Sequence, residues 1–238
     1  MTTELRTYQA RIIASIGGAN AIVKMPTGSG KTVVAAEMIK IKLDEDSSLA
    51  ALFLVPTLDL VDQQSKVLKK WCPHAHVFPF RGGMADPPKE ETEGQVCIVA
   101  TPDAFLALRQ RKNHVFGWHA FSIVVFDEVH HVLKDHPYRH IALRLKAWHD
   151  REMGSEDERI QILGLSASLT YDVTEAKVTS TLNRLCAELS IENMASPSVE
   201  ELEEGGYLPP CGRNVELDFS SEIPEGVVAK SERKNHMI

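Results

Sequence analysis

Residues 25–32 of the chain are Met25-Pro26-Thr27-Gly28-Ser29-Gly30-Lys31-Thr32, and they indicate its fold class more clearly than any other segment. The apolar run Ala21-Ile22-Val23-Lys24 before it has strand character, and residues 33–42 after it are typical of a helix. A strand that turns through glycines into a helix leaves several backbone N–H groups pointing at one spot, where the helix dipole also favours negative charge. The alternative is a glycine-rich turn that happens to precede a helix. Because both flanking elements are present, the stretch predicts a phosphate-binding site.

Each residue type in this stretch suits a triphosphate. Gly28 and Gly30 allow the backbone to approach a phosphate closely, Lys31 can reach the β- and γ-phosphates, and the Thr32 hydroxyl can ligate Mg²⁺. This is the P-loop pattern with one departure, because Met25 stands where the pattern has its first glycine. The candidate nucleotide-binding residues here are Thr27, Gly28, Ser29, Gly30, Lys31 and Thr32.

A second stretch carries two adjacent carboxylates. Phe121-Ser122-Ile123-Val124-Val125-Phe126 is an apolar run that ends abruptly in Asp127 and Glu128. Such a strand places its carboxylates at the carboxyl edge of an open α/β sheet, where ligands bind. We expect Asp127 to hold the magnesium shell and Glu128 to orient or deprotonate the attacking water, as phosphoryl transfer to water requires. The alternative is an acidic pair on the surface.

Composition and charge narrow the class of protein. The chain has 238 residues with 43% hydrophobic content, which suits one large domain or two small ones, and we expect one domain followed by a tail. The net charge of −7 argues against a protein that coats nucleic acid through a basic surface, although a groove of backbone amides and hydroxyls remains open. The four cysteines have no paired spacing, so reduced thiols are expected. Because no long apolar run is present, we expect a protein of the cytoplasm or nucleus without a membrane partner.

The remaining chain alternates buried apolar strands with amphipathic helices. This order predicts an α/β fold with a mostly parallel sheet and helices on both faces. Expected strands are 21–24, 49–55, 77–80, 96–100, 121–126 and 160–165, and expected helices are 5–16, 33–42, 58–70 and 104–111. The acidic stretch 200–206 is interpreted as a solvated turn.

Two residues of the first helix suit an adenine base. The Gln9 carboxamide offers a donor and an acceptor together, which matches the edge of adenine, and the Arg6 guanidinium can stack on its face. A solvated glutamine on a surface helix is the alternative.

The chain resembles the superfamily-2 helicases over nearly its whole length. Met25 to Thr32 resembles their motif I, and Asp127-Glu128-Val129-His130 resembles motif II, the DExH box. The other matches, in chain order, are the Q motif (Arg6, Gln9), motif Ia (Pro56, Thr57), the GG motif (Arg81, Gly82, Gly83), motif Ib (Thr101, Pro102, Asp103) and motif III (Ser166, Ala167, Ser168).

The resemblance implies a RecA-like P-loop NTPase domain that uses ATP and Mg²⁺. It also implies a helix over residues 178–189. It assigns RNA contacts to motifs Ia, GG and Ib, and coupling of ATP to nucleic acid to motif III. His130 belongs to the same coupling, whereas a zinc pair formed by His136 and His140 is disfavoured because further ligands are missing.

The stretch His136-Pro137-Tyr138 narrows the resemblance to helicases of Dicer and RIG-I-like receptors. Ser166 and Val129 depart from the residues commoner in this group, and they leave Dicer and receptor both open. The implied function is the ATP-binding half of an RNA helicase or translocase on double-stranded RNA, in a Dicer-like silencing protein. The alternatives are an ATP-gated double-stranded-RNA sensor and a DNA translocase.

These helicases contain two RecA-like domains with ATP between them, and the second supplies arginine fingers. We expect residues 1–219 to form the first domain, and 220–238 to be a tail or linker towards a second domain in cis. Since an arginine finger is worth about 10³ to 10⁵ in rate, the chain alone is expected to hydrolyse ATP very slowly.

Overall fold

The computed structural model describes residues 4–84, 95–111, 116–152, 160–167, 175–205 and 207, without the side chains of 151–152 and 175–178. The strands are β1 (Ala21–Lys24), β2 (Ala50–Leu54), β3 (His76–Phe80), β4 (Val96–Ala100), β5 (Phe121–Phe126), β6 (Gln161–Ser166) and β7 (Asn193–Ala195). The helices are α1 (Thr7–Ile16), α2 (Lys31–Glu45), α3 (Leu58–Trp71), α4 (Pro102–Arg109), α5 (Pro137–Glu152), α6 (Glu175–Leu189) and α7 (Val199–Glu204). Two 3-10 helices, η2 (Trp118–Ala120) and η3 (Val129–Leu133), complete the described elements.

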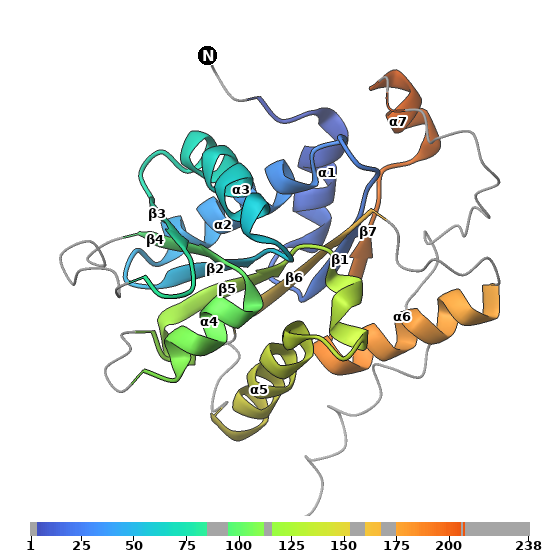
Figure 1. Cartoon of the computed structure of the whole chain (residues 1–238). Coiled ribbons are helices and arrows are strands. Elements are labelled where there is room, and N and C mark those ends of the chain that lie inside the picture. Colours follow the sequence, from blue (N-terminus) through green and yellow to red (C-terminus); the bar gives the residue numbers. More distant parts are fainter. Residues whose placement is uncertain are drawn as a thin grey trace, which may run out of the picture.

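These strands form one parallel sheet in the order β3-β4-β2-β5-β6-β1-β7 (Figure 1). Each neighbouring pair in the described part runs parallel, so the strands are joined by crossovers, and helices fill most of these connections. The α/β fold with a parallel sheet is therefore confirmed. Because every strand points the same way, the residues that follow the strands meet at one edge.

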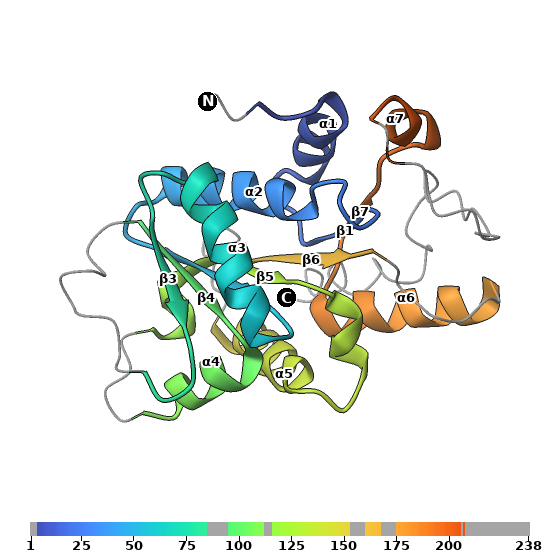
Figure 2. The same cartoon turned by 45° about the horizontal axis from the view of Figure 1, so that its top comes forward.

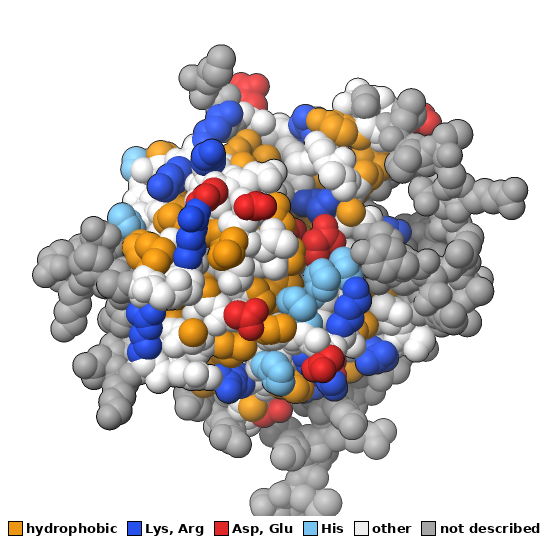
Figure 3. Space-filling view, in the orientation of Figure 1, with side chains coloured by type: hydrophobic (Ala, Val, Ile, Leu, Met, Phe, Trp, Pro, Cys, Tyr) orange, Lys and Arg blue, Asp and Glu red, His pale blue; other side chains and the backbone are white. Residues whose placement is uncertain are grey.

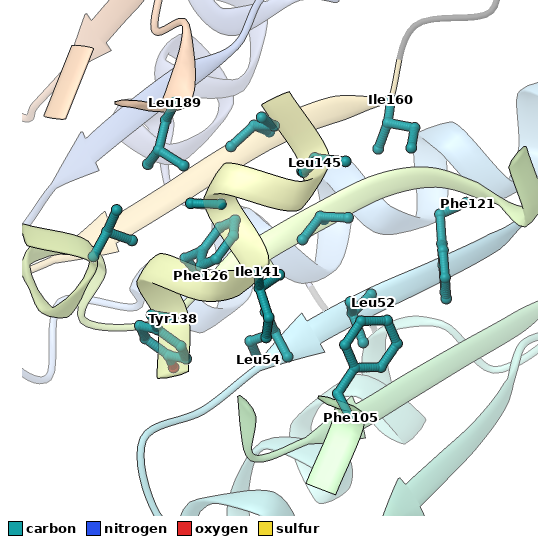
Figure 4. Close-up of a cluster of buried hydrophobic side chains, with 14 of the residues drawn as sticks. Leu52, Leu54, Phe105, Phe121, Phe126, Tyr138, Ile141, Leu145, Ile160 and Leu189 are labelled. Atoms are coloured by element: carbon teal, nitrogen blue, oxygen red, sulfur yellow. The ribbon is translucent and has the colours of Figure 1, made fainter. Parts of the chain in front are cut away.

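Helices cover both faces of the sheet (Figure 2). Strand side chains alternate between the faces: Val23, Phe53 and Val125 join the core under α1, α2 and α3, whereas Ile22 and Phe126 join the core under α4, α5 and α6. Figure 4 shows the core that contains Phe126, under α4, α5 and α6. Burial on both faces explains why these strands are continuous apolar runs in the sequence.

The expected strands and helices agree with the structure to within a few residues, but two α-helices and one strand were missed. Residues 200–206 were interpreted as a turn, and this was wrong, because Val199–Glu204 forms the helix α7. Helix α5 has Tyr138, Ile141, Ala142 and Leu145 buried at helical spacing, which was a usable signal. Strand β7 has only three residues and no apolar run to mark it.

Some expectations fall outside the described residues. Ser168 of motif III lies there, and so does the boundary expected between 219 and 220. Among the helices that the structure describes, none has the length and apolar character to cross a bilayer.

Candidate nucleotide-binding site

The predicted motifs meet at the carboxyl edge of the sheet. The loop at Lys31 follows β1, Ser166 ends β6, and Asp127 follows β5. The carboxyl ends of these three strands are aligned by the register of the sheet, in which Lys24 pairs with Ser166 and Phe126 pairs with Gly164. Since β6 lies between β1 and β5, the two outer strands are about 10 Å apart, two strand spacings. A triphosphate can bridge a gap of this size.

The phosphate loop has the backbone that its glycines predict. Gly28 has φ of 85° and Gly30 has φ of 97°, a region that side chains with a Cβ rarely adopt. Gly30 precedes the first turn of α2, so the N–H groups of that turn face the loop. The loop is fixed at its base, where the Met25 N–H donates to the Ser166 carbonyl over 3.0 Å. Thr27 is exposed, and Thr32 is half-buried on the first turn of α2.

Lys31 folds back over its own loop. Its ammonium donates to the carbonyl oxygens of Met25, at 3.0 Å, and of Pro26, at 3.4 Å. Burial lowers the pKa of Lys31, whereas the nearby charges of Glu128 and Asp127 act to raise it. The lysine therefore lies within electrostatic range of both carboxylates.

Asp127 is a buried carboxylate. Only 7% of the residue is exposed, and burial, reinforced by the charge of Glu128, raises its pKa to about 6. One oxygen accepts from the Glu128 N–H at 3.1 Å, and the other is 3.5 Å from the Gln64 amide nitrogen. A cation held here would favour the charged carboxylate.

Glu128 has a left-handed backbone, with φ of 52° and ψ of 56°. A residue with a Cβ is rarely held in this region, and such positions cluster at functional sites. The turn starts η3 and brings His130 against motif III, where its Nδ1 is 3.5 Å from the Ser166 hydroxyl and 3.4 Å from a Glu128 carboxylate oxygen. Burial lowers the pKa of His130, which favours the neutral imidazole. Motifs II and III are thus in direct contact.

Val129 explains the glycine inside β6. A Cβ on Gly164 would lie 2.8 Å from Val129 Cγ2, closer than such atoms approach in proteins. Val129 is fully buried, in agreement with its interpretation as a position that binds no ligand. The absence of a side chain at Gly164 lets η3 lie directly on the sheet.

The Q-motif residues gather on one atom of the phosphate loop. The Ser29 carbonyl oxygen accepts from the Tyr8 hydroxyl at 2.6 Å, from Gln9 Nε2 at 3.2 Å and from Arg6 Nη1 at 3.2 Å. These bonds hold α1 on the loop, although α1 precedes β1 and the loop follows it.

Gln9 keeps part of its hydrogen-bonding capacity. Its Nε2 uses one donor on Ser29, and its Oε1 accepts from the Arg6 N–H at 3.0 Å. A carboxamide has two donors and two lone pairs, so one of each is not used by these bonds. The pair that remains is the pair that an adenine edge requires, although Gln9 itself is only 3% exposed.

The residues assigned to RNA contacts share the same edge but follow β2, β3 and β4, the other half of the sheet. Pro56 and Thr57 lead into α3, where the exposed Thr57 is the N-cap residue. Gly82 and Gly83 are exposed, whereas Arg81 pairs with Asp62 on α3. In motif Ib the Thr101 side chain caps α4 at 3.4 Å and Pro102 is buried, which leaves Asp103 exposed.

Residues 6–176 match the model of the DEAD/DEAH box helicase family. The chain belongs to this family. Its motifs I, II and III thus stand around one edge in a helicase domain, which agrees with the resemblance found in the sequence.

Relatives of this helicase domain include a receptor and an endoribonuclease. The human "Antiviral innate immune response receptor RIG-I" is 29% identical over 219 residues, which are 86% of this chain and 23% of the relative. "Endoribonuclease Dicer homolog 2b" of Oryza sativa subsp. japonica is 30% identical over 249 residues, 95% of this chain and 17% of the relative. The helicase domain of Hef from Pyrococcus furiosus has a TM-score of 0.60 at 25% identity, covering 82% of this chain and 38% of that chain. The chain spans about a quarter or less of these two curated relatives.

Several residues at the helicase site were not predicted. Tyr8 was overlooked between Arg6 and Gln9, and Gln64 lies on the buried face of α3, where a polar residue among apolar ones was a signal.

The rings of His131 and His136 stack with centroids 4.8 Å apart. In Figure 3, histidine side chains gather beside acidic ones on this face of the molecule. Burial lowers the pKa of His136, and the charge of Asp103 in motif Ib acts against this effect.

Proposed function

We propose that this chain is the ATP-binding half of a DExH-box RNA helicase or translocase that acts on double-stranded RNA. The observation that carries the proposal is the meeting of Lys31 with Asp127 and Glu128 at one sheet edge, close enough for the carboxylates to act on the pKa of the lysine. Triphosphate chemistry needs a cation, a phosphate cradle and carboxylates together.

The residues present fit ATP with Mg²⁺. Asp127 is buried with its charged form disfavoured, a state that a bound cation would relieve, and Thr32 supplies a hydroxyl on the first turn of α2. Mg²⁺ would neutralise charge on the phosphates. Glu128 would orient the attacking water, and Lys31 would exchange its loop carbonyls for phosphate oxygens.

Double-stranded RNA is supported by the relatives and by the layout of the edge. Relatives carry the names Dicer homolog, RIG-I receptor and, in mouse, "ATP-dependent RNA helicase DHX58". We propose that Thr57, Gly82, Gly83 and Asp103 lie along the sugar-phosphate backbone, with Arg81 released from Asp62 to contact it. Contacts to sugar and phosphate give RNA over DNA discrimination through the 2′-hydroxyl, and little base preference.

The likeness to RIG-I supports a second candidate, a double-stranded-RNA sensor in which ATP turnover proofreads binding. Both candidates use the same site. Both also require a second RecA-like domain in cis, whose arginine finger supplies about 10³ to 10⁵ in rate. We therefore propose that this chain alone turns ATP over very slowly.

Two substitutions test the assigned roles at the nucleotide site. Lys31→Ala removes the cation that contacts the phosphates, so binding of a fluorescent ATP analogue with Mg²⁺ should be lost. Glu128→Gln keeps the shape of the side chain and affects only the orientation of the attacking water, so binding of the ATP analogue should persist. Lys42→Ala, at the far end of the same helix, is the matched control for removal of a lysine.

Each part of the proposal would be contradicted by a different result. Equal loss of binding in the Lys31 and Glu128 variants would reject the division of roles, and no binding by the unchanged chain would reject the nucleotide site. Rapid, RNA-stimulated hydrolysis by the unchanged chain would contradict the need for a second domain. Binding of double-stranded RNA and of DNA of equal length, with and without the analogue, tests the nucleic-acid class.

A further inference from the structure

The segment after β7 returns to the phosphate loop. Helix α7 lies beside α1, as Figures 1 and 2 both show. The Arg11 guanidinium on α1 binds both carboxylate oxygens of Glu201, at 2.9 and 2.6 Å, and also donates to the Ser196 carbonyl at 3.1 Å. Glu201 at the same time caps α7 by accepting from the Ser198 N–H at 2.7 Å. One carboxylate therefore both orders α7 and attaches it to α1.

This attachment places Tyr207 at the mouth of the nucleotide site. The Tyr207 N–H donates to the Leu202 carbonyl at 2.7 Å, which fixes the residue against the end of α7. Its Cε1 atom is 4.0 Å from the position that a Cβ on Gly28 would occupy. The ring centroid is 4.5 Å from Cζ of Arg6, so the ring lies on the guanidinium of the Q motif.

Arg6 is thus held in two ways. Within the plane of the guanidinium, Nη1 donates to the Tyr8 hydroxyl at 2.9 Å and to the Ser29 carbonyl at 3.2 Å. Tyr207 covers one face of the plane. Arg6 nevertheless remains exposed. A planar cation with a fixed orientation and an accessible surface is suited to stack on an aromatic ring.

We infer that Tyr207 is a positioning residue of the base site: it holds the Arg6 guanidinium so that its other face stacks on the purine of the nucleotide. The inference rests on the proposed ATP function and deepens it. Fixing the guanidinium before binding lowers the entropy lost when the base is bound, so affinity rises although Tyr207 itself stays on the far side of Arg6. The gain applies to ligands that have a base and is absent for those that have only phosphates.

Isothermal titration of the full chain with Mg-ATP and with Mg-tripolyphosphate tests this. Since an exposed cation–π contact is worth about 0.5 to 1 kcal/mol, Tyr207→Ala should weaken ATP binding about two- to fivefold. Tripolyphosphate binding should be unchanged, because the proposed stacking of Arg6 is on the base and tripolyphosphate has none. Tyr207→Phe keeps the ring and should restore ATP affinity. Arg11→Ala releases α7 and should weaken ATP binding in the same selective way.

Three results would overturn the inference. Unchanged ATP affinity in Tyr207→Ala would show that the ring does not prepare Arg6. Tighter ATP binding would mean that Tyr207 occupies the place of the base, and equal losses for ATP and tripolyphosphate would mean that it supports the loop. Failure of the proposed function looks different, because the unchanged chain would then bind neither ligand.

Discussion

Asp127→Asn should make the protein more stable at neutral pH while it removes a group of the nucleotide site. The wild-type carboxylate is 7% exposed, and burial together with the charge of Glu128 raises its pKa from 3.8 to about 6, against the smaller opposing effect of Lys31. The folded protein therefore disfavours the charged form of Asp127. An asparagine has the same shape and never ionises.

The size and sign of the effect follow from the two pKa values. A rise of about two pH units, at 1.36 kcal/mol for each, corresponds to about 3 kcal/mol when fully developed. Below pH 3.8 both states hold the proton and Asp127 contributes nothing. Between about pH 4 and pH 6 the unfolded state releases the Asp127 proton while the folded state keeps it, so the free energy of unfolding falls as pH rises. Above about 6 the whole cost remains.

Urea unfolding followed by tryptophan fluorescence at pH 4, 5, 6, 7 and 8 measures this. The difference in unfolding free energy between Asp127→Asn and wild type should grow with pH and level off above 6. Asp62→Asn, which removes an exposed carboxylate paired with Arg81, is the control and should change stability by about 1 kcal/mol or less. A difference for Asp127→Asn that is the same at pH 4 and pH 8 would refute the reasoning.

Two further substitutions test the packing around motif II. Tyr138→Phe should leave the unfolding free energy unchanged or raise it, because the buried Tyr138 hydroxyl has no hydrogen-bond partner among the described residues; a loss above about 1 kcal/mol in urea unfolding would indicate a partner. Gly164→Ala should cost about 1 to 3 kcal/mol, because its Cβ meets Val129 at 2.8 Å. Adding Val129→Ala should recover part of that cost, and strictly additive losses in the double variant would contradict the contact.

The strands could be predicted because burial on both faces of the sheet restricts which residue types they contain. A strand buried on both faces must be apolar throughout, so 121–126 and 21–24 were found at their observed bounds. Helix α7 was missed because its residues are mostly acidic. Its capping box, Ser198 with Glu201, was a usable signal in the sequence, whereas its pairing with Arg11 forms only in the folded protein. Motif I was readable because phosphate binding needs glycines and a lysine at fixed spacing.

The contacts that join the motifs could not be predicted from spacing along the chain. Gln9, Tyr8 and Arg6 converge on Ser29 only because α1 packs against α2, and the contact of His130 with Ser166 depends on the left-handed turn at Glu128. The ring of Tyr207 lies on Arg6 across some two hundred residues of sequence. Such pairings carry no local pattern.

The phosphate loop, the acidic strand end and the parallel sheet that carries them could be read from the amino-acid sequence, because they depend on local periodicity and on residue type. The strand order β3-β4-β2-β5-β6-β1-β7, which puts Lys31 and Asp127 on either side of Ser166, became visible only in the folded chain. Strand order follows from how crossovers and helices bury the two faces together, and that is a property of the whole chain.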